Sequence, residues 1–244
     1  MNRLLTGVAA LALPLALTAC NSSSPKPQSQ PSPSAAATTP APAPTPTATA
    51  TGDDKQRVAA IQLALSDLPS GWKTQPNTTT AAEQLKNDRN FDTCLGEPTI
   101  ETIQTTSSEV DFSRGDGFAF AATLINVTKT EAQATPYLAV LNGPKGVSCS
   151  VASARRQPPP KGAAVVNVTG SQLPAPAGAF GIRVVLTYKL SSGRQVTLTV
   201  DDFGMVVKRF ITQVVFTGLV QPPQKALEDS VTAKVFARAA ANAS

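Results

Sequence analysis

Residues 181–200 read GIRVVLTYKLSSGRQVTLTV, and this stretch carries the clearest structural signal in the chain. Apolar and polar side chains alternate along residues 182–190 and again along residues 196–200. This is the period of a β-strand that buries one face. The Ser-Ser-Gly at residues 191–193 predicts a tight turn between the two runs. The stretch therefore predicts an antiparallel β-hairpin.

The hairpin is followed by a third apolar run. Asp202-Phe203-Gly204 is typical of a turn, and residues 205–216 are apolar on both faces of a strand. Such a run is typical of a central strand in a sheet. We therefore expect a three-stranded meander, with Asp201 and Asp202 solvated in its second turn.

A second hairpin is predicted upstream, where residues 110–112 and 118–124 alternate in the same way. Its connection contains Arg114-Gly115-Asp116, which resembles an integrin-binding tripeptide. The plainer interpretation, a polar glycine-rich hairpin turn, is the one we expect.

Helices are predicted over residues 53–65, from a capping box at 128–131 to about residue 141, and after Pro222-Pro223. Pro136 should kink the second helix and Gly143-Pro144 should end it, with Cys149 just beyond. Residues 73–106 are irregular, with short helical pieces expected around 81–85 and near Cys94, and residues 165–168 form a short strand. Because helices and strands are segregated along the chain, the sequence predicts an α+β fold. We expect an antiparallel sheet of about five to six strands, a hairpin plus the meander, with helices packed on one face.

The N-terminus has the features of an export signal. A basic start at Arg3 precedes about 14 mostly apolar residues, fewer than the roughly 20 that span a bilayer. Leu17-Thr18-Ala19-Cys20 then resembles the bacterial lipobox. That resemblance implies cleavage of residues 1–19 and lipidation of Cys20, and two or three acyl chains form a stable membrane anchor.

Residues 20–52 are expected to be the lipidated cysteine and a tether. From Asn21 to Gly52 the chain is rich in Ser, Pro, Ala and Thr, and Lys26 is its one charge. Such composition cannot bury a core and favours extended polyproline II conformations. We expect a single folded domain over residues 53–244, held away from a membrane on this tether. A Pro-rich ligand for another domain is the alternative for this segment.

Two cysteines remain after lipidation, Cys94 and Cys149. In an exported chain such a pair most simply forms a disulfide. Two free thiols or a metal pair are the alternatives, although a metal site needs more ligands than two sulfurs.

The composition excludes several kinds of chemistry. The chain has no His, which removes Ser-His-Asp and Cys-His catalysis and any His-ligated metal centre. It also has no phosphate-binding Gly-rich loop and no nucleophile elbow. All 16 acidic residues and nearly all of the 21 basic residues are mixed along the predicted domain, which argues against nucleic-acid binding. We therefore expect no enzyme activity, no metal and no cofactor.

The lipobox, the tether, the Leu-Pro-Ser-Gly-Trp turn at residues 68–72 and the pair Cys94 and Cys149 together resemble a known group. They are similar to uncharacterised actinobacterial cell-surface lipoproteins. They also resemble the extracellular sensor domain of mycobacterial receptor Ser/Thr kinases. The resemblance implies a ligand cleft between sheet and helices and two disulfides, whereas this chain has one remaining cysteine pair. A sandwich of the Mog1/PsbP type is a related possibility.

These observations predict a membrane-anchored, extracytoplasmic module that binds a ligand or acts as a sensor in the cell envelope. Its partners would be the membrane, through the lipid anchor, and a small envelope molecule or an envelope protein. Two alternatives stay open: an envelope hydrolase that works without His, and a structural protein associated with the cell wall. Aromatic side chains are the candidate ligand contacts, each of which could equally be a core residue: Trp72, Phe118, Phe120 and Tyr188.

Overall fold

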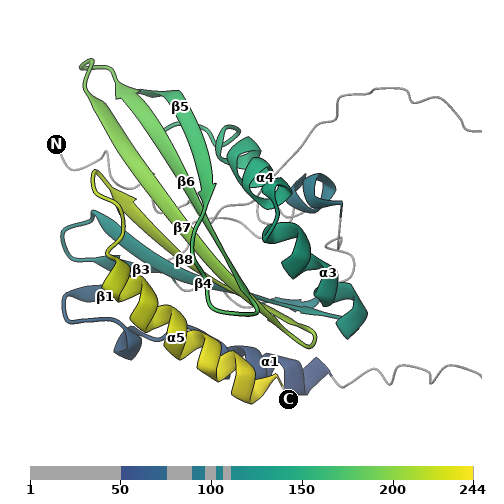
Figure 1. The fold of residues 1–244 in the computed structure, drawn as a ribbon. Helices are drawn as coiled ribbons and strands as arrows, with labels where there is room; N and C mark the ends of the chain where they lie inside the picture. The colour runs from purple at the N-terminus through teal and green to yellow at the C-terminus, as the bar shows by residue number, and fades with distance from the viewer. Residues whose placement is uncertain (1–50, 76–89, 97–102, 107–110, 244) are drawn as a thin grey trace, which may run out of the picture.

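The computed structural model describes residues 51–75, 90–96, 103–106 and 111–243. These residues form one antiparallel sheet flanked by helices (Figure 1). The α+β class predicted from the sequence is therefore confirmed. The proposed signal peptide, Cys20, most of the tether and the helical piece expected around residues 81–85 lie outside the described residues.

Within the described residues the sheet has eight strands rather than five to six, in the order β1-β3-β4-β8-β7-β6-β5, and β2 pairs with the end of β4 while β3 pairs with its start. Neighbouring strands in this order are all antiparallel. The strands are β1 Trp72–Gln75, β2 Ile103–Thr106, β3 Asp111–Arg114, β4 Ala119–Thr128, β5 Ala163–Gln172, β6 Ala179–Leu190, β7 Gln195–Val207 and β8 Phe210–Leu219.

Helices cover both faces of this sheet, which corrects the prediction that they pack on one face. On one face lie α1 Thr51–Ile61 and α5 Lys225–Asn242, which pack into one hydrophobic cluster with the sheet. On the other lie α3 Glu131–Leu141 and α4 Pro144–Ala154, together with a helical segment over residues 90–95. Figure 1 shows the sheet running between these two groups of helices.

The physical reason for two helical layers is the pattern of β8. Phe210, Val214 and Phe216 are buried toward α1 and α5, whereas Ile211 is buried in the cluster of α3 and α4. A strand that is apolar on both faces must be covered on both faces, because either set left bare would expose a large apolar surface.

The second turn of the meander lies later than predicted. β7 runs without a break from Gln195 to Val207, and the chain turns at Lys208 and Arg209 instead of at Asp202-Phe203-Gly204. Gly204 lies within the strand, and the position needs a glycine because the ring of Phe180 on β6 fills the space above it. A Cβ at position 204 would lie 2.1 Å from that ring. The glycine therefore makes room for an aromatic ring, a role that Gly has within strands as well as in turns.

The predicted disulfide between Cys94 and Cys149 is confirmed, with the two Cα atoms 5.8 Å apart. Cys149 lies inside α4 rather than after a helix, because Pro144 begins a new helix where the sequence predicted only an end. Cys94 lies in the helical segment over residues 90–95. The disulfide thus attaches this segment to α4 on the face of the sheet that α3 and α4 cover.

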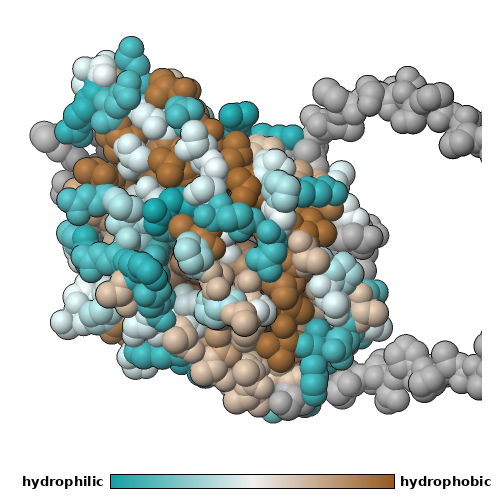
Figure 2. Space-filling model, viewed as in Figure 1, coloured by the Kyte–Doolittle hydropathy of each residue, from teal (hydrophilic) through white to brown (hydrophobic). Residues whose placement is uncertain are grey.

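The surface of the described residues is mixed. Figure 2 shows hydrophilic side chains scattered over the visible face, with hydrophobic ones between them. Four large hydrophobic side chains in the described part of the chain are exposed: Leu65, Phe118, Val166 and Val220.

Replacing Cys94 and Cys149 together by Ser should lower the free energy of unfolding by about 2–4 kcal/mol. The disulfide joins residues 55 positions apart, so it limits the freedom of the unfolded chain. Urea denaturation followed by circular dichroism measures this loss. A reducing agent should shift the parent chain by a similar amount and leave the double variant unchanged. Equal unfolding midpoints for parent and variant would contradict this role.

Candidate functional site

A pocket of about 340 Å³ lies where β8 ends and α5 begins. Its volume falls within the range of small-molecule sites. Three parts of the chain form its wall: Trp72 and Arg114 from the β1–β3 pair, residues 118–120 at the start of β4, and residues 216–224 with Leu227 from β8 to α5.

Strand pairing brings these segments together. Trp72 is directly opposite Arg114 in the β1–β3 pair, and the turn after β3 leads to Phe118. The backbone N–H of Leu219 donates to the carbonyl of Phe118 at 2.8 Å, which joins the start of β4 to the end of β8.

The segment between β8 and α5 closes the wall by folding back over Gly218. A Cβ at position 218 would lie 2.2 Å from the carbonyl oxygen of Gln221, so any side chain there would displace this connection. The absence of a side chain at Gly218 is therefore a condition for the pocket.

The structure brings together three of the four aromatic residues that the sequence singled out. Trp72, Phe118 and Phe120 all line the pocket. Trp72 also belongs to the hydrophobic cluster under α5, and Phe120 also packs against the cluster of the opposite face. Tyr188 does not line the pocket. It is buried on β6 in the cluster of α3 and α4, and this burial raises the pKa of its hydroxyl.

Two exposed apolar side chains stand at the pocket. Phe118 is 43% exposed and Val220 is 61% exposed, and both belong to its lining. Val220 also has a φ of 74°, a conformation that β-branched residues rarely adopt. Val220 is not among the candidate residues predicted from the sequence, because no local pattern distinguishes it from the end of an ordinary strand.

Arg114 is the one ionisable side chain in the lining, and it already has a partner. Its guanidinium forms an ion pair of 2.7 Å with Asp116, and this contact holds the pKa of the Asp116 carboxyl below its usual value. Asp116 also accepts a hydrogen bond of 3.0 Å from the N–H of Phe118. The Arg-Gly-Asp sequence is thus a hairpin turn with its own internal contacts, which position Phe118.

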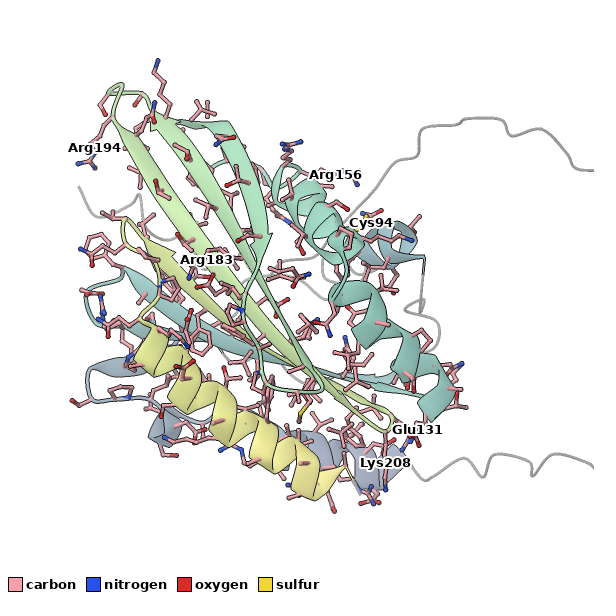
Figure 3. The ribbon with its side chains drawn as sticks, viewed as in Figure 1. Cys94, Glu131, Arg156, Arg183, Arg194 and Lys208 are labelled. Atoms are coloured by element: carbon pink, nitrogen blue, oxygen red, sulfur yellow. A yellow bond between two sulfur atoms is a disulfide. The ribbon has the colours of Figure 1, made fainter. Side chains whose placement is uncertain are left out.

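A buried charged cluster adjoins the pocket. Asp201 on β7 lies beside Phe216, a pocket residue, and accepts two hydrogen bonds of 2.6 and 2.5 Å from Arg183 on β6. Figure 3 shows Arg183 over the middle of the sheet, away from Arg194 and Lys208 at the hairpin ends. Glu228 in the first turn of α5 faces the same pair and is 4% exposed.

The protonation of this cluster follows from its burial. Burial, together with the hydrogen bond and the charge of the adjacent Asp201, raises the pKa of the Glu228 carboxyl to about 8, and the charge of Arg183 opposes this rise. Glu228 is therefore mainly protonated at neutral pH, beside the carboxyl of Asp201 that accepts both hydrogen bonds from Arg183. Such an arrangement connects the start of α5 to the sheet through hydrogen bonds without burying a second negative charge.

The prediction that Asp201 and Asp202 are solvated in a turn is wrong. Both lie within β7, so their side chains point to opposite faces of the sheet. Asp201 has no exposed surface. Burial raises the pKa of Asp202 to about 7, and its Oδ1 has no hydrogen-bond partner within the described residues. The continued alternation of Phe203, Met205 and Val207 was the signal that the strand extends through both aspartates.

The ranges 51–75, 90–96, 103–106 and 111–243 also bear on metal binding and on membrane crossing. Within these ranges, no group of three or more Cys, Asp or Glu side chains is arranged to hold a metal ion. None of the helices described is long and apolar enough to cross a bilayer.

The fold and the site define an α+β domain with one antiparallel sheet, helices on both faces and a pocket at one sheet end. The chain is similar to the extracellular domain of PknH from Mycobacterium tuberculosis, with 13% identity and a TM-score of 0.47 over 75% of this chain and 95% of that one. It is also similar to an uncharacterised protein of Mycobacterium smegmatis, the Rv0999 ortholog, with 10% identity and a TM-score of 0.34 over 73% and 95%.

The resemblance to a mycobacterial kinase extracellular domain, expected from the sequence, is thus found among solved structures. No protein-family model and no curated protein matches the sequence. The similarities are too distant to assign a ligand, so the function is argued from the pocket itself.

Replacing Glu228 by Gln should flatten the pH dependence of stability. The folded chain keeps a proton on Glu228 from about pH 4.5 to about pH 8, whereas the unfolded chain loses it near pH 4.5. Stability therefore falls as pH rises through this window. Gln mimics the protonated carboxyl, so the variant should match the parent at pH 4.5 and exceed it at pH 8 by about 1.4 kcal/mol or more.

Urea unfolding at a series of pH values measures this difference. The matched control is Asp229→Asn, because Asp229 is the neighbouring carboxylate but is 61% exposed and pairs with Lys225 at the surface. That variant should keep the slope of the parent. A Glu228→Gln variant that is less stable than the parent at pH 8 would rule out a protonated Glu228.

Proposed function

We propose that this protein is a lipid-anchored, extracytoplasmic module that binds a small molecule of the cell envelope in the pocket between β4, β8 and α5. The observation that carries the proposal is a pocket whose lining includes Trp72, Phe118 and Phe120 and whose rim exposes apolar side chains. A concave site of this size with aromatic residues in its lining is the usual form of a small-molecule site.

The extracytoplasmic location is supported by the sequence and by the disulfide. Residues 1–20 have the form of a lipoprotein signal ending at Cys20. The bond between Cys94 and Cys149 is of a kind that persists in oxidising compartments outside the cytoplasm.

The pocket and the start of α1 lie at opposite ends of the sheet. In the first turn of α1, Asp54 forms a 2.7 Å ion pair with Arg209 at the turn between β7 and β8. The pocket lies at the far end of β8, nine residues from Phe210, which corresponds to about 30 Å of strand. A chain anchored through the segment before α1 would therefore present the pocket on the end remote from its attachment.

The alternative of a hydrolase that works without His gains no support from the carboxyl groups of the cluster. Asp201 and Glu228 lie between α5 and the sheet, and both are almost fully buried. Asp201 is already bound to Arg183 through both of its oxygens. A catalytic carboxyl pair must reach a substrate, whereas this pair is covered by the helix that carries Glu228.

The binding role is tested by native mass spectrometry on the chain from Asn21 onward, incubated with a total extract of envelope small molecules and lipids. We expect a discrete added mass that is lost on denaturation and that Phe118→Ala weakens at least fivefold. The matched control is Val166→Ala, since Val166 is similarly exposed but lies on β5, away from the pocket. An added mass unaffected by Phe118→Ala, or no added mass, would contradict the proposal.

The anchor is tested separately in cells. Replacing Cys20 by Ala should move the chain from the membrane fraction to the soluble or signal-retained fraction and abolish labelling with a palmitate analogue. Labelling that persists in the variant would exclude Cys20 as the lipidated residue.

A further inference from the structure

The chemistry of the pocket indicates which class of molecule it takes. Apart from Arg114, no lining side chain is ionisable, and Arg114 already forms an ion pair with Asp116. A charged ligand group would therefore lose hydration without gaining an unpaired partner of opposite charge, which is unfavourable. A hydrocarbon would instead displace water from Phe118, Val220 and Leu227, the lining side chains with exposed apolar surface, which is the favourable direction of the hydrophobic effect.

The rim of the pocket extends its apolar surface outward. Phe118 and Val220 are two of the four large hydrophobic side chains exposed within the described residues, and both line this pocket. Isolated exposed hydrophobic residues are ordinary, whereas exposed ones that adjoin an apolar cavity extend one continuous surface. A ligand that fills the cavity and extends beyond it would cover both side chains.

The backbone of Val220 points to a role for its side chain. At a φ of 74°, Gly would be accommodated without strain, whereas a β-branched residue is not. Hydrogen bonds hold this strained position in place: the N–H of Val220 donates to Thr197 at 2.7 Å, and that of Leu219 to Phe118 at 2.8 Å. Strained residues of this kind tend to occur at functional sites, and here the strain fixes an isopropyl group at the rim.

The volume limits how much of a ligand the pocket encloses. A cavity of about 340 Å³ is equivalent to roughly ten water molecules. That space admits part of a hydrocarbon chain and not a whole membrane lipid, so the remainder must leave past Phe118 and Val220.

Resting on the proposed function, we infer that the pocket binds an uncharged hydrocarbon segment, such as part of an acyl or polyprenyl chain. The rim residues Phe118 and Val220 hold that segment where it leaves the pocket. The polar end of the ligand stays outside and contributes little to affinity.

Trp72 provides a direct readout, because it is the single Trp of the chain and part of the pocket wall. A bromine-tipped undecanol and the corresponding bromine-tipped undecanoate are titrated into the chain from Asn21 onward, below their aggregation limits. Bromine quenches Trp fluorescence on contact. We expect saturable quenching by both probes, with dissociation constants within about threefold of each other, because the hydrocarbon part that they share carries the affinity.

Two rim variants separate a binding role from a structural one. Phe118→Ala should weaken binding about tenfold, which corresponds to the loss of one large apolar contact. Val220→Gly should weaken it about threefold or more while the thermal midpoint stays equal or rises, because Gly relieves the backbone strain. Val166→Ala, the exposed control on β5, should leave binding unchanged.

Three results would overturn the inference. These are no saturable quenching by either probe, binding of the carboxylate alone, and quenching that neither rim variant changes. The first two, combined with an added mass from envelope extract that depends on Phe118, would leave the pocket as a binding site for another class of molecule. Absence of both signals would overturn the proposed function as well.

Discussion

Burial of the β7–β8 hairpin on both faces is the constraint on which the rest of the structure depends. Val214 and Phe216 face one helical layer, while Leu198 and Val200 face the other. Neither layer can be removed without exposing a row of buried apolar side chains in the middle of the sheet. The hairpin therefore requires α1 and α5 on one face and α3 and α4 on the other, although these helices come from separate parts of the chain.

Two buried ion pairs position the helices of one layer at opposite ends of the sheet. Asp54 and Arg209 join the start of α1 to the turn of the hairpin. Arg183 and Asp201, with the protonated Glu228, join the start of α5 to the strands at the pocket end. Since the first turn of α5 and the segment before it form one wall of the pocket, the charged cluster helps to set the shape of the site without lining it.

Much of the fold is visible in local patterns. The alternation in residues 182–200 identifies β6 and the start of β7, and the apolar stripe of residues 227–235 identifies α5. Three of the four aromatic residues chosen as candidate contacts lie in one pocket. Tyr188 is separated from them because its strand places it on the face covered by α3 and α4, and the alternation of a single strand does not say which face of the sheet will hold a pocket.

The predictions that the structure corrects failed for physical reasons that lie outside the local sequence. Asp-Phe-Gly at residues 202–204 is typical of a turn, yet Gly204 is a strand residue because Phe180 from the neighbouring strand needs the space above it. The sequence predicts a solvated turn for Asp201, yet Arg183, which like Phe180 lies on β6, forms an ion pair with it in the folded protein. In both cases the deciding atom belongs to β6, more than fifteen residues away in the chain.

The sequence by itself determined the class of fold and the pairing of the two cysteines of the domain. These depend on periodicity and composition, which are properties of neighbouring residues. Only the tertiary structure decided that both faces are covered, that Asp201 is buried while the adjacent Asp202 points to the opposite face, and that Val220 and Phe118 both lie at the pocket rim. Such features depend on which strands and helices meet in space, because a burial site or a cavity is formed by side chains that the sequence keeps far apart.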